Sequence, residues 1–459
     1  MNLFHSIDPA TEDIIFEHHV TAYSEIDVCI NKALENKMVW QQTTVEQRIG
    51  FVRAFQTLLK KNKDDIATCI SMETGKPLWE SLQEVNAVVG KVDISIDSFL
   101  ECCQEKNFNF NQKEYSLFYK PIGLMAVLGP FNFPAHLPHG HIIPAILAGN
   151  LVLFKPSEYT TEVAKKCIKL WYEAGLPEYV LQLILGDGNV GEQLYQHKDI
   201  DGVLFTGGYK TGKKISTYLG SFPEKLLALE LGGNNPLVIS KHSYNQDVFD
   251  AIVQSAFLTS GQRCTCARRL IVVDCEDKVT FETELQKKIF SLKVGAYTDI
   301  DEPFMGPVIH KQSQDYIVKK YSSLLNHGAK EIVPQKKLFD NGYFLSPSVL
   351  DVSHVKELDD DECFGPFLKL MYVSSFNEAI LEANNTNYGL SASLFSSDSE
   401  EHKLFFQQVK AGIINFNSPT NGASSKLPFG GVGYSGNYRP SAYFAANYCS
   451  YPIASVKSL

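Results

Sequence analysis

The chain has 459 residues, of which 44% are apolar and 20% are charged, and its formal net charge is −10. This length exceeds what one hydrophobic core usually supports, so we expect two large lobes. The acidic balance, without a long run of Lys and Arg, argues against a nucleic-acid partner.

The sequence suggests neither secretion nor membrane insertion. The segment from Met1 to Pro9 lacks both a basic flank and an apolar core of signal-peptide length, and no apolar stretch reaches the length of a membrane span. The ten cysteines are not spaced like the disulfide framework of a small secreted domain. We therefore expect a cytoplasmic protein with reduced thiols.

Helical and parallel-sheet patterns follow one another along the first half of the chain. Apolar positions recur at helical spacing over residues 27–70 and 78–100, and the turn-like segment Glu73 to Pro77 separates the two stretches. From residue 121 onwards, short apolar runs alternate with helix-length segments, which predicts a parallel sheet covered by helices. These runs are 124–128, 151–154, 181–185, 203–205 and 226–229.

A second α/β series begins just after Glu230. It contains apolar runs and two amphipathic helices, which we expect to form a separate lobe. The runs are 236–239 and 270–273, and the helices lie near 247–259 and 278–291. Residues 106–119 and the tail after Tyr443 alternate apolar and polar side chains, so both are expected to be edge strands that cross to a partner subunit.

A cysteine and a carboxylate carry the clearest chemical signal. Cys264 follows a Gly-Gln turn, and Glu230 ends an expected strand upstream of it. A thiol needs local activation at neutral pH, and an acyl-thioester needs a base to activate water. These residues could therefore serve as nucleophile and base in aldehyde oxidation, whereas a plain buried thiol is the alternative for Cys264. No Cys or His pair near Cys266 has metal-ligand spacing, so no metal site is expected there.

Other polar groups are expected at the carboxyl edge of the first sheet, where ligands of open α/β folds bind. Asn132 could donate to an oxyanion, an interaction worth about 3 kcal/mol, or simply cap a loop. Lys155 and Glu158 could bind an adenosine ribose, with Glu158 favouring NAD over NADP, or form a surface ion pair. The Gly-rich segment 205–212 could approach a pyrophosphate at a helix N-terminus.

Three histidines, His136, His139 and His141, invite a zinc hypothesis. Their spacing lacks the His-Glu-x-x-His pattern, and one short segment places three ligands poorly for a tetrahedron. We expect ordinary polar or substrate-facing roles for them and predict no metal site.

Seven motifs together resemble the aldehyde dehydrogenase superfamily in order and spacing, and the resemblance covers essentially the whole chain. The motifs lie at 129–134, 154–158, 205–207, 230–233, 261–264, 362–366 and 428–431. The resemblance implies an α/β fold with two doubly wound α/β lobes, for cofactor and catalysis, plus a small oligomerisation β-extension. The implied ranges are 1–103 and 121–232 for NAD binding, 233–432 for catalysis, and 104–120 and 440–459 for oligomerisation. It also implies a homodimer or a dimer of dimers.

The resemblance also implies a role for each matching residue. Cys264 would be the nucleophile, Glu230 the base that activates water, and Asn132, with the Cys264 N–H, the oxyanion donor. The implied contacts to NAD are Phe131, Lys155, Ser157, Glu158, Thr206, Gly207, Gly208, Gly212, Leu231, Gly232, Glu362 and Phe364. The implied reaction oxidises an aldehyde through a thiohemiacetal and a thioester to the carboxylic acid.

Within the family, segments 136–141, 230–236, 261–269 and 436–442 resemble the group that oxidises N-succinyl-L-glutamate 5-semialdehyde in bacterial arginine catabolism. By position, the substrate tunnel would be lined by Phe133, Leu137, Arg263, Thr265, Ser424 and Ser425. Arg263 could bind a distal carboxylate or form a structural salt bridge. Three alternatives stay open: another semialdehyde or a broad aliphatic range with NAD(P), acyl transfer to coenzyme A, and a binding protein without activity.

Three departures from the family pattern stand out. We expect the chain to begin a strand or hairpin later than its relatives. Gly208 stands where a Ser is usual, which removes a hydroxyl and about 1 kcal/mol of possible hydrogen bonding to the cofactor. Cys363, inside the motif 362–366, has no interpretation from sequence.

Overall fold

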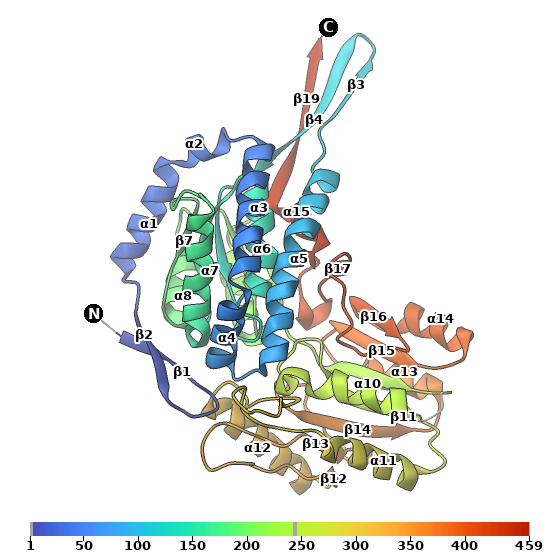
Figure 1. Ribbon diagram of the computed structural model, residues 1–459. Coiled ribbons are helices and arrows are strands. Elements are labelled where there is room, and N and C mark those ends of the chain that lie inside the picture. Colours follow the sequence, from blue (N-terminus) through green and yellow to red (C-terminus); the bar gives the residue numbers. More distant parts are fainter. Residues whose placement is uncertain (1–2, 242–245, 459) are drawn as a thin grey trace.

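The computed structural model describes residues 3–241 and 246–458. Residues 1–2, 242–245 and 459, which belong to the expected domain ranges, lie outside this description. The chain forms two α/β bodies and a narrow projecting sheet (Figure 1). Within the described ranges, no helix has both the length and the apolar character needed to span a membrane.

The N-terminal part is helical, as predicted. A hairpin that the sequence patterns did not predict comes first, formed by β1 (Leu3–Ile7) and β2 (Ile14–His19). The helices are α1 (Tyr23–Glu35), α2 (Lys37–Gln41), α3 (Val45–Lys61), α4 (Lys63–Thr74) and α5 (Leu78–Cys102). Gly75 ends α4 in the left-handed conformation, at φ 72°, and Pro77 begins α5. This pair accounts for the predicted turn between the helices.

The first sheet has five parallel strands in the order β7-β6-β5-β8-β9. They are β5 (Leu124–Leu128), β6 (Leu151–Lys155), β7 (Leu181–Leu183), β8 (Gly202–Thr206) and β9 (Leu226–Glu230), which confirms the five predicted runs. Helices α6 (His136–Ala148), α7 (Thr161–Glu173), α8 (Gly188–Gln196) and α9 (Tyr209–Leu219) connect or follow them. Because the strands are parallel, the segments after β5, β6, β8 and β9 all meet at one edge.

The second sheet has seven strands in the order β12-β13-β14-β11-β10-β15-β16, and only β12 is antiparallel to its neighbour. The strands are β10 (Asn235–Ile239), β11 (Ala267–Val273), β12 (Lys330–Val333), β13 (Ser348–Asp351), β14 (Phe367–Val373), β15 (Ser391–Phe395) and β16 (Ile413–Phe416). The helices are α10 (Gln246–Phe257), α11 (Lys278–Phe290), α12 (Lys311–Asn326), α13 (Phe376–Ala383) and α14 (Ser399–Gln408). Strands β10 and β11 and helices α10 and α11 confirm the predicted second series.

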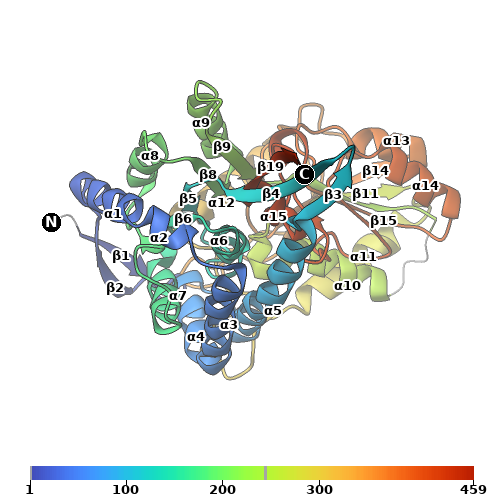
Figure 2. The same ribbon diagram turned by 90° about the horizontal axis from the view of Figure 1, so that it is seen from above.

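A three-stranded antiparallel sheet projects from the body (Figures 1 and 2). It consists of β3 (Lys106–Phe110), β4 (Lys113–Pro121) and β19 (Ser450–Ser458), in the order β19-β4-β3. Asn111 and Gln112, both with positive φ, make the two-residue turn between β3 and β4. The expectation that residues 106–119 form an edge is therefore wrong for β4. This strand is central, because it pairs with β3 on one side and β19 on the other.

The C-terminal tail returns to the first lobe before it enters the projecting sheet. It passes through the short strand β18 (Ser441–Ala442), paired with β17 (Pro428–Phe429), and through α15 (Ala446–Cys449). The buried Asn150 accepts a hydrogen bond from Gly123 N (2.9 Å) and donates to Cys449 O (2.7 Å). One amide thus ties the tail to the start of β5. The division into domains at the ranges given above stays a prediction.

Candidate active site

Two cavities meet at Cys264. One, of about 270 Å³, lies between α5, α6 and the loop after β16, and the other, of about 440 Å³, lies along the carboxyl edge of the first sheet. Cys264, Leu137 and Thr206 line both cavities. A thiol at this junction can be reached by one molecule from each side.

The turn before Cys264 has an unusual backbone. Thr259 and Ser260 have φ of 55° and 54°, a conformation that costs non-glycine residues about 1–3 kcal/mol each. Gly261 follows with φ 72°, and a Cβ there would lie 2.0 Å from Gly365 O. Only a glycine fits this close approach. This strained turn directly precedes the nucleophile and sets the direction of its side chain.

Side chains from distant segments hold this turn. Thr259 Oγ1 donates to the buried Glu80, and Arg263 reaches the same carboxylate at 2.5 Å and donates to Thr259 Oγ1 at 2.8 Å. On the far side, Asn235 Nδ2 donates to Cys264 O (2.7 Å) and Cys266 O (2.8 Å). The backbone around Cys264 is therefore fixed from both lobes.

Asn132 lies beside Cys264 and is buried. Its Nδ2 donates to Gln262 O (2.9 Å), and its backbone carbonyl accepts from Lys76 Nζ (2.8 Å). An amide nitrogen carries two hydrogens, so the bond to Gln262 fixes the amide plane and leaves the second hydrogen for another acceptor. Asn132 lines the larger cavity together with Cys264 and Glu230. The structure thus brings together the three residues expected to act on one carbonyl group.

Glu230 ends β9 with its carboxyl group buried. Oε1 accepts from Ser441 N at 2.9 Å, whereas Oε2 has no hydrogen-bond partner among the described residues. Burial raises the pKa of Glu230 well above its usual value, and the hydrogen bonds from Ser441 and the charge of Lys91 only partly offset this. Burial thus disfavours the carboxylate form of the resting side chain, and a change in the site that favours its charge would make more of it available as a base.

The Cys264 thiol is protonated at rest. Burial raises its pKa, and the carboxylates of Glu362 and Glu230 raise it further, while Arg268 opposes them. Glu362 accepts from Gly233 N at 3.1 Å, and burial raises its own pKa to about 7. The resting thiol therefore needs a change in its surroundings, or a base, before it can attack.

The larger cavity has the features that a dinucleotide requires. It contains the first turn of α9, where unpaired N–H groups favour phosphate, and the Lys155 and Glu158 side chains, whose charged atoms are 3.7 Å apart. Eleven of the twelve residues expected to contact NAD line it: Phe131, Lys155, Ser157, Glu158, Thr206, Gly207, Gly208, Leu231, Gly232, Glu362 and Phe364. Gly212 does not line it. It packs behind Leu231, whose side chain a Cβ at Gly212 would meet at 2.5 Å.

Gly208 and Cys363 now have structural descriptions. Gly208 is the N-cap of α9 and offers no side-chain cap, and a Cβ there would meet nothing within 4 Å. The space for the usual Ser hydroxyl is open, so no packing demand explains the Gly. Cys363 is buried in the apolar core that includes Ile317 and Phe367, which makes it a core side chain.

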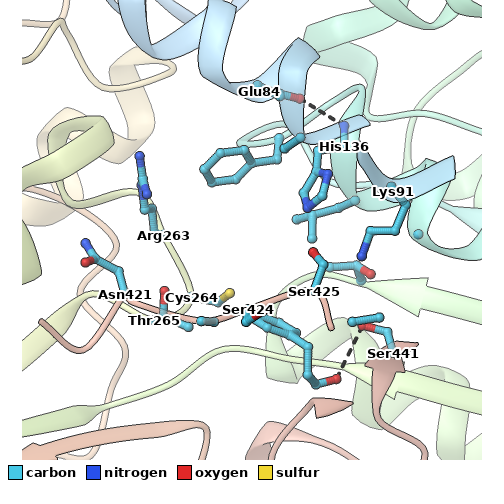
Figure 3. A pocket seen from close by; sticks show the side chains of 18 of the residues that line it. Glu84, Lys91, His136, Arg263, Cys264, Thr265, Asn421, Ser424, Ser425 and Ser441 are labelled. Carbon is cyan, nitrogen blue, oxygen red and sulfur yellow. Dashed lines mark hydrogen bonds between the residues drawn. The ribbon is translucent and has the colours of Figure 1, made fainter. Parts of the chain in front are cut away.

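All six residues expected to contact the substrate line the smaller cavity: Phe133, Leu137, Arg263, Thr265, Ser424 and Ser425. Figure 3 labels the last four of them around Cys264. Arg263 is already engaged by Glu80, so its structural salt bridge is formed in this state. The side chain also lies over the Phe133 ring, 5.1 Å from its centroid.

The lining residues that were not predicted include Glu84, Lys91 and Ser441. A signal for Lys91 was present in the sequence, since this residue falls on the apolar stripe of α5 between Val88 and Val92. A lysine at such a position is uncommon. Glu84 accepts hydrogen bonds from Ala135 N and His136 N and so caps α6.

The side chains of His136, His139 and His141 have different surroundings. His139 is stacked in the core on Phe55 and accepts from Trp171 Nε1 (3.1 Å). His141 lies 3.2 Å from Thr206 Oγ1, and His136 faces the smaller cavity. Burial lowers the pKa of all three, so they are neutral imidazoles. In residues 3–241 and 246–458, no three His, Cys, Asp or Glu side chains are grouped as a metal site would require.

Comparisons with known proteins agree with this geometry. The model of the aldehyde dehydrogenase family matches residues 2–451. The N-succinylglutamate 5-semialdehyde dehydrogenase of Novosphingobium aromaticivorans is 44% identical over 455 residues, which cover 98% of this chain and 95% of that protein.

Solved structures agree as well. The betaine aldehyde dehydrogenase of Staphylococcus aureus, in complex with NAD+, superimposes with a TM-score of 0.92 at 26% identity, over 100% of this chain and 92% of that one. A 1-pyrroline-5-carboxylate dehydrogenase mutant of Thermus thermophilus has a TM-score of 0.94 at 24% identity, over 100% and 90% of the two chains, which supports the fold alone.

Replacing Glu362 tests the electrostatic control of Cys264. We expect Glu362→Gln to lower the pKa of the thiol, because it removes the carboxylate that raises it most after burial. Alkylation of Cys264 by iodoacetamide, followed by peptide mass spectrometry without cofactor, should become several-fold faster. The gain should appear only as the pH rises through about 7, where wild-type Glu362 becomes charged. Asp361→Asn, at the neighbouring half-buried carboxylate, is the control and should leave the rate unchanged; an equal or slower rate in Glu362→Gln would contradict the assignment.

Proposed function

The chain belongs to the aldehyde dehydrogenase family, and we propose that it oxidises N-succinyl-L-glutamate 5-semialdehyde to N-succinyl-L-glutamate with NAD, as in arginine catabolism. The main support is the convergence of Cys264, Glu230 and Asn132 on one cavity. The substrate assignment rests on the 44% identity, over nearly the full chain, to a relative named for this semialdehyde.

In the proposed reaction, Cys264 forms and later releases the covalent bond to substrate. Its thiolate adds to the aldehyde carbon, and the resulting oxyanion accepts hydrogen bonds from Asn132 Nδ2 and the Cys264 N–H, each worth about 3 kcal/mol in such a site. Bound NAD supplies the two-electron acceptor that converts the thiohemiacetal to a thioester. Glu230 then removes a proton from the attacking water, the C–S bond breaks, and the carboxylic acid leaves with the thiolate restored.

The chain's own residues divide the binding of NAD among three parts of the larger cavity. We assign the ribose hydroxyls to Lys155 and Glu158, the pyrophosphate to Gly207, Gly208 and the first turn of α9, and the nicotinamide riboside to Glu362 and Phe364. Support comes from their common lining of one cavity that ends at Cys264. A carboxylate at Glu158 would repel a 2′-phosphate, which favours NAD over NADP.

We also propose a homodimer and a cytoplasmic location. The projecting sheet leaves both β3 and β19 as unpaired edges, and Phe108, Phe110 and Val456 on it are 62%, 61% and 56% exposed. Edge strands with exposed apolar side chains are typical of surfaces that a partner covers. The location is supported by the ten cysteines, all of which are free.

A substrate panel tests the proposed function. We expect kcat/KM for N-succinyl-L-glutamate 5-semialdehyde to exceed those for succinic semialdehyde, glutamate 5-semialdehyde and propanal by about tenfold or more, since each lacks part of the proposed contacts. NADH absorbance gives the rates. Similar efficiencies across the panel would refute the narrow assignment, and a coenzyme A thioester among the products would refute the hydrolytic step.

Glu230→Gln should separate oxidation from hydrolysis. Loss of the base is expected to slow thioester hydrolysis by roughly 10²- to 10⁴-fold, so that NADH appears in one stoichiometric burst and the acyl-enzyme accumulates in intact mass spectra. In the wild type, hydrolysis should slow as the pH falls, because the raised pKa of Glu230 leaves less carboxylate at low pH. Cys264→Ala, the control, should show neither burst nor adduct. An unmodified mass in Glu230→Gln after mixing with aldehyde and NAD would disprove the role.

The projecting sheet can be tested as the dimer interface by light scattering. The wild type is expected at twice the 51.3 kDa chain mass or a multiple of it. Adding charges through Phe108→Asp with Phe110→Asp should shift the protein towards monomer, whereas Phe290→Asp, equally exposed on α11, should not. An unchanged mass in the double variant would exclude this interface.

A further inference from the structure

Lys91 is a buried cation without a partner. It lies on α5, its side chain is 4% exposed, and it lines the same cavity as Cys264. Its Nζ makes no hydrogen bond, and no ion pair within 4.0 Å, with any residue in the described part of the chain. The other cations near this wall are paired, Lys76 with Glu84 and Arg263 with Glu80, both at 2.5 Å.

The carboxylates around the cavity leave Lys91 without an ion-pair partner. Glu80 and Glu84 are taken by Arg263 and Lys76, and Glu230, which accepts from Ser441 N, forms no ion pair with Lys91 among the described residues and only partly offsets the effect of burial on it. The neighbouring His136 and His141 are neutral, and Lys91 itself, with a pKa lowered by burial to about 8, remains mostly protonated at neutral pH. A buried ammonium without a counter-charge is strongly unfavourable, so the site favours an anion from outside.

The position of Lys91 suits an anionic substituent of the aldehyde. Figure 3 shows Lys91 and Arg263 on opposite sides of Cys264. Along α5, Glu80 and Lys91 are separated by about 16 Å at roughly 1.5 Å per residue, so the paired and unpaired cations lie at different ends of one wall. Exposed Gln83 and Ala87 lie between them on the same wall.

We infer that Lys91 binds a carboxylate of the substrate and thereby sets the preference for a carboxylated over an uncharged aldehyde. This inference rests on the proposed function, whose substrate has two carboxylates. One lies beside the amide nitrogen and the other ends the succinyl group, and either could supply the charge-assisted hydrogen bond. Lys91 is thus a specificity-determining residue, distinct from the residues that act on the aldehyde carbon.

A different role for Lys91 would be to tune Glu230, whose pKa its charge lowers slightly. That role concerns the water-activating base, so it would affect every aldehyde alike. The carboxylate role affects only substrates that carry the anion. A comparison of charged and uncharged aldehydes therefore separates the two.

The test compares kcat/KM of the wild type, Lys91→Met and Lys91→Arg with three aldehydes: N-succinyl-L-glutamate 5-semialdehyde, N-acetyl-L-glutamate 5-semialdehyde and butanal. Lys91→Met should lower kcat/KM for the succinyl compound about 30-fold, mainly through KM, and change butanal less than about threefold. Lys91→Arg should recover much of the loss. An equal loss with the acetyl compound identifies the carboxylate beside the amide, whereas an unchanged rate identifies the succinyl carboxylate.

Two further measurements show that an effect of Lys91→Met comes neither from misfolding nor from the rate of turnover. The thermal midpoint of Lys91→Met should not fall, because a buried unpaired charge is replaced by an apolar chain of similar length. The inhibition constant of N-succinyl-L-glutamate against butanal oxidation should rise by a similar factor. Lys169→Met, which removes an exposed lysine on α7 outside both cavities, should change neither the ratio of kcat/KM between charged and uncharged aldehydes nor the inhibition constant.

The outcomes distinguish this inference from the proposed function. If the wild type does not prefer the succinyl semialdehyde, the proposed function fails, and the comparison is made with succinic semialdehyde and the acid inhibitor. The Lys91 inference is overturned if Lys91→Met lowers kcat/KM for charged and uncharged aldehydes equally. It is also overturned if the variant keeps the wild-type ratio between them and the wild-type inhibition constant.

Discussion

Two buried carboxylates, one turn apart on α5, hold the two halves of the site together. Glu80 binds the turn that carries Cys264, which comes from the second lobe. Glu84 binds Lys76 and the N-terminus of α6, and Lys76 in turn holds the carbonyl of Asn132 in the first lobe. The distance between nucleophile and amide is thus set by a single rigid helix, which suits a reaction that requires both at one carbonyl group.

The same burial that fixes these groups also controls their charge. Cys264, Glu230 and Glu362 line one cavity; burial raises the pKa of each, and the two carboxylates raise that of Cys264 further. A ligand that displaces water or brings positive charge changes this balance. A protonated thiol is a poor nucleophile, so Cys264 reacts little with other electrophiles until cofactor and substrate are bound.

Much of the fold followed from local patterns, since the three central strands of the first sheet, β5, β6 and β8, are short apolar runs buried on both faces. Strand order was harder: β4 and β19 are distant in sequence, and alternation alone does not say which strand is central. In the site, motif order brought Cys264, Glu230 and Asn132 into one expectation, and they line one cavity. The position of Lys91 on the apolar stripe of α5 was visible in the sequence, but the absence of an ion-pair partner among the described residues is known only from the three-dimensional packing.

Along α5, some charged residues of the substrate cavity form ion pairs and Lys91 does not, and this difference affects how the substrate preference of the cavity can evolve. Exchanging Arg263 or Glu80 would release the left-handed turn at Thr259 and Ser260, so changes there would damage the fold and the nucleophile together. Other residues line the same cavity but have few or no contacts of this structural kind: Lys91, Gln83, Ser424 and Ser425. New preferences for aldehydes can therefore arise by drift at these positions while the reaction chemistry is inherited intact.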